Sequence, residues 1–212
     1  ASGMKAVMMA AQTISLGQAD VIVAGGMESM SLAPYLLPNY RTGQLMGHAQ
    51  LLDSITYDAL TCAFGNNSMG DAAEETVKKF GITREAQDAY CIESYKRTAE
   101  AWKRGFMKNE VVSVTVESKK GKVEVEEDEE FKKIKADKVP TLRPVFRKDG
   151  TITAANASKI NDGAAALVVM SADKAKKLGI KPLARIVSFA DNELDPVHFS
   201  MAPIGAMEKA LK

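Results

Sequence analysis

The order of apolar and polar residues predicts helices and strands that follow one another closely. Residues 2–16 are apolar on most faces of a helix, with Ser2 as a candidate N-cap and Gly17 as a stop. Residues 20–26 form a short apolar run that ends in two glycines, which predicts a buried strand and a close backbone approach or turn at the glycines. A helix that leads into a strand with almost no linker indicates α/β architecture.

The regular spacing of apolar residues is weak after the first predicted strand and becomes clear again from residue 68. Residues 32–68 mix prolines and glycines with short apolar clusters, so we expect mostly irregular structure with a helical piece near 49–60. Ser68 is a suitable cap for a helix over 69–80, which carries acidic residues near its start and lysines near its end. Gly81 is expected to end that helix.

A longer helix is predicted from its cap at Thr83 to Arg104. Its apolar positions recur at helical spacing, and they are Ala86, Ala89, Tyr90, Ile92, Tyr95, Ala99 and Trp102. Valines then alternate with polar residues over 110–117 and 122–126, which predicts a β-hairpin with one solvated face.

The last third begins with a turn and a strand. Asn161-Asp-Gly is a turn signal, and the apolar run Ala164–Met170 predicts a strand that is buried on both faces. Further elements are a short helix over 171–179, a strand over 183–190 and a helix over 203–212.

Composition serves mainly to exclude classes of protein and of site. The 212 residues include 46% hydrophobic and 26% charged residues, which is ordinary for a globular protein. A net charge of +1 gives no general attraction to nucleic acid or to a membrane surface, and no apolar run approaches the ~20 residues of a transmembrane helix. Cys62 and Cys91 make neither a disulfide framework nor a metal-ligand spacing, which favours a reducing compartment.

Residues 153–158 are the most informative stretch for chemistry. The segment is small throughout, with Asn156 and Ser158 as its expected hydrogen-bonding side chains. Small residues allow a ligand or an ion to approach backbone carbonyl groups. On composition alone, the alternative is a tight turn that enters a core strand, and that interpretation has the better support.

Several motifs resemble those of the thiolases. They are Asp-Gly-Thr-Ile-Thr-Ala-Ala-Asn-Ala-Ser-x-x-Asn-Asp-Gly-Ala-Ala-Ala at 149–166, Ala-Ser-Gly-Met-Lys-Ala at 1–6 and Val-Ala-Gly-Gly-Met-Glu-Ser-Met-Ser at 23–31. Met-Gly-x-x-Ala-Glu at 69–74 and Ile-x-Ser-Tyr at 92–95 are further matches. The last is similar to the potassium-responsive mitochondrial acetoacetyl-CoA thiolases, and the resemblance covers essentially the whole chain.

This resemblance implies a duplicated α/β fold, each half a five-stranded sheet flanked by helices, with an inserted loop domain. Residues 1–31 and 142–181 would belong to the N-terminal half. Residues 32–141 would form the loop domain, and 182–212 would open the C-terminal half. The core would be incomplete here, because most of the C-terminal half is expected to lie outside this sequence.

The implied activity is that of an acetyl-CoA acetyltransferase: reversible condensation of two acetyl-CoA to acetoacetyl-CoA and CoA, or thiolysis in reverse. The nucleophilic cysteine is expected just before Ala1, where a helix N-terminus favours a thiolate. No catalytic residue is therefore expected within this segment, and His198 does not correspond to the catalytic histidine. The rival interpretation is a non-catalytic thiolase-like protein that binds acyl-CoA or acts as a scaffold.

The resemblance also implies binding residues. Coenzyme A would contact Tyr95, Lys133, Ile134, Lys138 and Ser158. A potassium ion would be held by Tyr95 and the carbonyl groups of Ala154, Ala155 and Ala157. The structural alternatives are a solvated lysine face over 131–138 and core packing for Tyr95, Cys62 and Cys91. For the two cysteines we retain core packing.

Two departures from the family pattern affect the expected pocket. Ser68 stands where many thiolases have histidine beside the acyl-CoA pocket, and Lys135 replaces an acidic residue. The resemblance further implies a homotetramer or homodimer, no nucleic-acid or membrane partner, and a mitochondrial or otherwise cytoplasmic location.

Overall fold

The computed structural model describes residues 1–119 and 121–212. These residues form two compact units. The first unit consists of Ala1–Ala72 with Lys159–Lys212, and the second is Ala73–Ser158. Helices and strands are mixed along the chain, which confirms the α/β prediction. No helix in the described ranges is long and apolar enough to cross a membrane.

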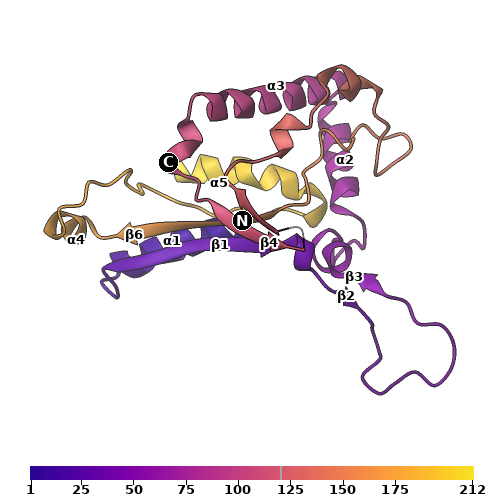
Figure 1. Ribbon diagram of the computed structural model, residues 1–212, viewed down its shortest axis with the longest axis horizontal. Helices are drawn as coiled ribbons and strands as arrows, with labels where there is room; N and C mark the ends of the chain where they lie inside the picture. Colours follow the sequence, from indigo (N-terminus) through magenta and orange to yellow (C-terminus); the bar gives the residue numbers. More distant parts are fainter. Residues whose placement is uncertain (120) are drawn as a thin grey trace. The chain divides into compact units, whose positions relative to one another are not determined.

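The first unit is built on two long antiparallel strands. Strand β1 (Val21–Ser29) pairs with β6 (Asp162–Met170) along its whole length, from Val21 opposite Met170 to Ser29 opposite Asp162. Helix α1 (Ser2–Ser15) lies along this ladder and packs mainly against β1 (Figure 1). The first predicted helix and both of these predicted strands are confirmed.

Glycines bring α1 and the strands into backbone contact. A Cβ atom at Gly25 would lie 2.1 Å from the carbonyl oxygen of Ala165, and one at Gly26 would lie 3.2 Å from the Cα of Gly3. A side chain at Gly25 would therefore push the two strands apart. The expected close approach is confirmed, but β1 continues through the glycines to Ser29 instead of ending there.

The ladder is far more exposed than its apolar sequence predicts. Ala24 is the buried residue of β1, whereas Val23 and Val168, which lie opposite each other on the strands, are 70% and 62% exposed. Within the described residues, α1 is the element that packs extensively along the ladder. An apolar run thus predicted the strands correctly, but burial on both faces also requires a covering layer on each face.

The predicted turn at Asn161-Asp-Gly is wrong, because β6 already begins at Asp162. The carboxylate of Asp162 accepts hydrogen bonds from the hydroxyl and the N–H of Ser31, in the short 3₁₀ helix η1 (Met30–Leu32). These hydrogen bonds hold the pKa of Asp162 below its ordinary value, and the bond from the Ser31 hydroxyl has a larger effect than the bond from the Ser31 N–H. These bonds join the end of the ladder to the segment that follows β1.

The remainder of the first unit contains short elements. They are β2 (Tyr35–Leu36), β3 (Leu52–Asp53), the π-helical turn η2 (Ile55–Ala59), α4 (Ala172–Lys177), η6 (Pro196–Met201) and α5 (Ala202–Ala210). The mostly irregular 32–68 segment and its helical piece are confirmed, as are the helices near 171–179 and 203–212. Residues 183–190 form no strand, because the described residues supply no pairing partner for it.

Capping predictions succeed at two helices and fail at one. The hydroxyl of Ser68 accepts from the N–H of Asp71 at 3.0 Å and donates to its carboxylate at 2.7 Å, so it caps α2 (Met69–Phe80) as predicted. Thr83 caps α3 (Arg84–Lys103) as predicted. Ser171, which the sequence analysis did not single out as a cap, caps α4. Ser2 instead lies inside α1, whose N-cap is Ala1.

The second unit is organised around α3. Strands β4 (Val114–Ser118) and β5 (Gly121–Val125) form the predicted hairpin, although β5 is exposed on both faces. Three short 3₁₀ helices, η3 (Phe106–Asn109), η4 (Glu130–Lys132) and η5 (Ala136–Thr141), pack against α3 (Figure 1). The domain boundaries implied by the thiolase resemblance concern a larger fold and stay a prediction.

Candidate functional site

The segment Thr153–Ala157 forms a turn that is closed by its own polar groups. The N–H of Thr153 donates to the Asn156 side-chain oxygen at 2.7 Å, and the N–H of Ala157 donates to the Thr153 carbonyl at 3.0 Å. The Thr153 hydroxyl accepts from the N–H groups of Ala155 and Asn156 at 3.3 and 3.4 Å. Thr153 is fully buried, so these bonds are shielded from water.

Helix α3 holds this turn at two points. The side-chain N–H of Asn156 donates to the carboxylate of Asp88 at 3.2 Å, and the Cys91 thiol donates to the Ala155 carbonyl at 3.1 Å. Asp88 and Cys91 are both buried, three residues apart on α3. The alanine carbonyl groups singled out from the sequence therefore lie in a turn whose position is fixed from α3.

Asp88 is itself held by Arg84, one helical turn earlier. The Arg84 Nε donates to the Asp88 carboxylate at 2.7 Å, and its Nη2 donates to the carbonyl groups of Val139 and Leu142 at 3.0 and 2.9 Å. One guanidinium group thus joins α3, the end of η5 and the route to the turn. A buried carboxylate with a bonded cation and an amide donor is well satisfied.

A second buried carboxylate fixes the chain that enters the turn. Glu74 of α2 accepts hydrogen bonds from the N–H groups of Thr151 and Ile152, both at 2.9 Å, and from the Thr151 hydroxyl at 3.1 Å. Gln87 of α3 also donates to the Thr151 hydroxyl at 2.9 Å. The entry to the turn is therefore held from α2 and from α3.

Tyr95 lies one helical turn after Cys91, so the two residues share a face of α3. Its side chain is half-buried, and its hydroxyl makes no hydrogen bond to any residue in the described ranges. Ala155 and Ala157 are half-buried, while Ala154 and Ser158 are exposed. Among the described residues, the Tyr95 hydroxyl thus has no hydrogen-bond partner that would compete with a ligand.

The predicted lysines differ in their surroundings. The Lys133 ammonium lies 3.2 Å from a Glu130 carboxylate oxygen and 3.3 Å from one of Glu129. Hydrogen bonds to Glu130 and then Glu129 raise the pKa of Lys133. Lys138, in η5, is exposed and forms no ion pair with any described residue, so it offers more uncompensated charge to an anion. Ile134 is half-buried.

Sequence reasoning missed the polar groups that position the turn: Glu74, Arg84, Asp88 and Thr153. It placed the buried face of α3 on the apolar positions, but Tyr90 is 75% exposed and Asp88 is buried. The four-residue spacing of Arg84 and Asp88 was a usable signal for an ion pair. No local pattern indicated that this pair faces the interior.

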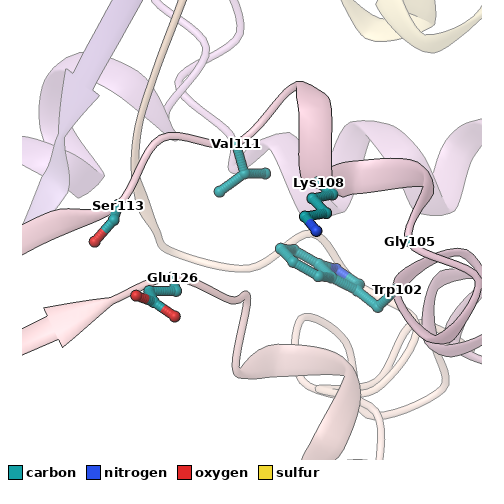
Figure 2. Close-up of a pocket in the computed structure, with 6 residues that line it drawn as sticks. All are labelled: Trp102, Gly105, Lys108, Val111, Ser113 and Glu126. Atoms are coloured by element: carbon teal, nitrogen blue, oxygen red, sulfur yellow. The ribbon is translucent and has the colours of Figure 1, made fainter.

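A separate hollow of about 340 Å³ lies at the C-terminal end of α3 and is lined by Trp102, Gly105, Lys108, Val111, Ser113 and Glu126. Figure 2 shows the Trp102 ring and the Lys108 side chain on one side, with Ser113 and Glu126 on the other. None of the binding residues expected from the sequence lines it. Trp102 stacks on Phe131 with ring centres 6.2 Å apart, which braces η4 next to Lys133.

Comparison with known proteins supplies the family. Residues 1–173 match the family model described as the N-terminal domain of thiolase. The whole chain is 52% identical to the mitochondrial acetyl-CoA acetyltransferase of Bos taurus, of which it covers 50%. The chain therefore spans about half the length of this curated relative.

Solved structures agree with that match. An acetyl-CoA acetyltransferase of Bacillus anthracis has a TM-score of 0.95 at 40% identity, covering 99% of this chain and 53% of that one. A thiolase of Ascaris suum in complex with coenzyme A has a TM-score of 0.91 at 44% identity, covering 98% and 53%. With a family model over most of its length and two solved relatives of the same fold, the chain belongs to the thiolase family.

Proposed function

We propose that the full-length protein is an acetyl-CoA C-acetyltransferase. It would condense two acetyl-CoA molecules reversibly to acetoacetyl-CoA and CoA, or cleave acetoacetyl-CoA by thiolysis. Membership of the thiolase family supports acyl transfer, and the name of the Bos taurus relative supports acetyl-CoA as the substrate. The chain spans half of that relative, so the proposal concerns the whole protein.

The observation that carries this proposal is the braced turn Thr153–Ala157, which leads directly to Ser158. Its polar side chains are satisfied internally or by α3, so its carbonyl groups are presented in a fixed arrangement. Preorganisation of this kind supports a binding role, because a ligand then orders little chain on binding. A plain connecting turn does not require two buried anchors on a neighbouring helix.

For coenzyme A, we infer contacts with Tyr95, Ile134 and Ser158 and attraction of a phosphate group by the lysines. Lys138 would carry more of this attraction than Lys133, whose charge is partly offset by Glu129 and Glu130. The Ascaris suum thiolase was solved in complex with coenzyme A, which supports a CoA-binding fold at this level of similarity.

For the cation, the donor chemistry of the turn fits a potassium ion. The carbonyl groups of Ala154, Ala155 and Ala157 and the hydroxyl of Tyr95 are neutral oxygen donors, and the turn itself carries no carboxylate. The nearest buried carboxylate on α3, Asp88, is engaged by Arg84 and Asn156. A monovalent ion bound there would supply positive charge and fix the carbonyl groups that precede Ser158.

In this mechanism the residues of the chain bind and orient coenzyme A, while reactive groups lie outside the sequence. The acetyl group would be carried by a cysteine expected immediately before Ala1, at the N-terminal end of α1. A second cysteine would move the proton at the substrate α-carbon. Backbone amides with Asn and His groups would stabilise the developing oxyanions.

We also infer the wider organisation from the family. Residues 1–31 and 142–181 would belong to the N-terminal thiolase half, 32–141 to the loop domain and 182–212 to the start of the C-terminal half. A homotetramer or homodimer is proposed on the same ground. A mitochondrial location is supported by the name of the Bos taurus relative.

The decisive experiment measures CoA binding and acetoacetyl-CoA thiolysis by the purified full-length protein. Binding with turnover is expected. Binding without turnover would identify a non-catalytic acyl-CoA-binding protein and refute the enzyme proposal. The residue before Ala1 gives an independent check, because the mechanism requires a cysteine there.

The cation proposal needs its own test. We expect KCl to activate thiolysis relative to NaCl at matched ionic strength, and Tyr95→Phe to blunt this response. Tyr90→Phe is the matched control, because Tyr90 lies on the same helix and is largely exposed. Equal rates in the two salts would leave Ala154–Ala157 as a plain turn.

A further inference from the structure

The Cys91 thiol contacts an oxygen that the proposed cation would share. Its Sγ lies 3.1 Å from the carbonyl oxygen of Ala155, which is a short approach for a thiol donor. Cys91 is buried and carries no disulfide. The hydrogen bond therefore lies out of water, where even a weak donor changes the charge distribution of its acceptor.

The turn does not depend on this thiol for its shape. Thr153 and Asn156 close it through four hydrogen bonds of their own, and Asp88 holds Asn156 from α3. Deletion of the thiol would leave this bracing in place. The main consequence of the Cys91 contact is thus electrostatic, at one carbonyl oxygen.

We propose that Cys91 weakens cation binding at the Ala155 carbonyl. The inference rests on the proposed cation site and extends it. The thiol hydrogen brings partial positive charge to an oxygen that a potassium ion would also approach, so the two compete for the same electron density. In this proposal Cys91 acts on the ion through the Ala155 carbonyl group, as a positioning residue.

Two substitutions separate this effect from packing. Cys91→Ala removes the donor, whereas Cys91→Ser replaces a weak thiol donor with a stronger hydroxyl donor. Competition predicts opposite changes: the alanine variant should bind potassium more tightly and the serine variant less tightly. A residue that served only as core packing would shift both variants in the same direction.

The test uses the full-length protein and two readouts. The first is the KCl concentration that gives half-maximal activation of acetoacetyl-CoA thiolysis. The second is the rise in melting temperature that KCl causes relative to choline chloride, which does not depend on activity. We expect Cys91→Ala to lower the half-activating concentration about two- to fivefold and Cys91→Ser to raise it by a similar factor.

Cys62→Ala is the matched control. Cys62 is also buried and carries no disulfide, but it belongs to the first unit, where its sulfur accepts from the N–H of Gly65 at 3.4 Å. This variant is expected to leave the half-activating concentration unchanged. Melting temperatures in choline chloride give the cost of the cavity left by each alanine, which is then subtracted from the salt response.

The outcomes distinguish the inference from the function on which it rests. Opposite shifts in the alanine and serine variants support it. Shifts in the same direction, or none, while the wild type responds to KCl would overturn the role of Cys91 and leave the cation site intact. No response in the wild type or either variant would overturn the cation site and the inference together, whereas a response confined to Cys91→Ala would support both.

Discussion

Two ion pairs on α3 have almost the same geometry but should differ greatly in their effect on stability. The Arg84 Nε lies 2.7 Å from the Asp88 carboxylate, and the Arg97 Nε lies 2.8 Å from the Glu93 carboxylate, in both cases four residues apart. The Asp88 side chain is 7% exposed and that of Glu93 is 45% exposed. Burial therefore separates the two pairs, and we predict that Asp88→Ala is the damaging change.

The magnitude follows from what Asp88 leaves behind. Removing one partner of a buried ion pair typically costs about 3–5 kcal/mol. Here the Arg84 side chain is 20% exposed and keeps its bonds to two backbone carbonyl groups, which lowers the cost, but Asn156 also loses an acceptor. We therefore expect Asp88→Ala to lower the free energy of unfolding by about 2–4 kcal/mol.

The assay is urea-induced unfolding of the full-length protein at a fixed subunit concentration, followed by circular dichroism. Glu93→Ala should unfold at nearly the wild-type midpoint, because solvent screens its pair with Arg97. Asp88→Asn, which keeps the shape and one acceptor oxygen, should fall between wild type and Asp88→Ala. If Asp88→Ala and Glu93→Ala unfold at the same midpoint, the assignment of the stability of this turn to a buried pair is wrong.

Three further predictions concern other parts of the chain. Gly25→Ala should destabilise the protein by about 1–3 kcal/mol or more. Gly163→Ala in the partner strand should be tolerated, because a Cβ atom there meets no atom within 4 Å. Thermal unfolding of both variants checks this difference. The lowered pKa of Asp162 means that its bonds to Ser31 stabilise the fold above the ordinary pKa of 3.8 and lose that effect as the pH falls through the lower folded value. The stability difference between wild type and Ser31→Ala should therefore shrink from about pH 5 to about pH 2, and a constant difference would contradict it. Lys138→Ala should weaken CoA binding more at low salt than at high salt, since charges are screened over about 8 Å at physiological ionic strength. Titration calorimetry at two salt concentrations measures this, and an equal loss of CoA affinity at both would contradict the prediction.

Patterns confined to one element were predictable from the sequence. The helices after Ser68 and Thr83 begin where their caps indicate, because capping depends on residues within one turn. Two adjacent glycines in an apolar strand predicted either a close backbone approach or a turn, and the contact at Gly25 shows that the close approach is the one present. The thiolase motifs singled out residues 153–158 as a candidate binding segment, and that role stays a prediction, whereas the sequence placed the turn at Asn161-Asp-Gly and not at Thr153–Ala157.

What could not be predicted depends on partners distant in sequence. The exposure of Val23 and Val168 reflects which layers lie beside the ladder, and no property of an apolar run reports that. Residues 183–190 have the composition of a strand but no pairing neighbour in the described ranges. Within α3, Asp88 has the pattern of an ordinary polar helix residue, and its hydrogen bond with Asn156, 68 positions away, is what sets it apart.

The contact between Gly3 and Gly26 has a consequence for mechanical precision. A helix that rests on a strand through side chains can shift by a fraction of an ångström as those side chains change rotamer. Here the first turn of α1 meets β1 through main-chain atoms, which have no rotamers to change. This backbone contact fixes the position of the N-terminal amide groups of α1 relative to β1. A group attached immediately before Ala1 would be held in a fixed position by the same contact, without help from neighbouring side chains.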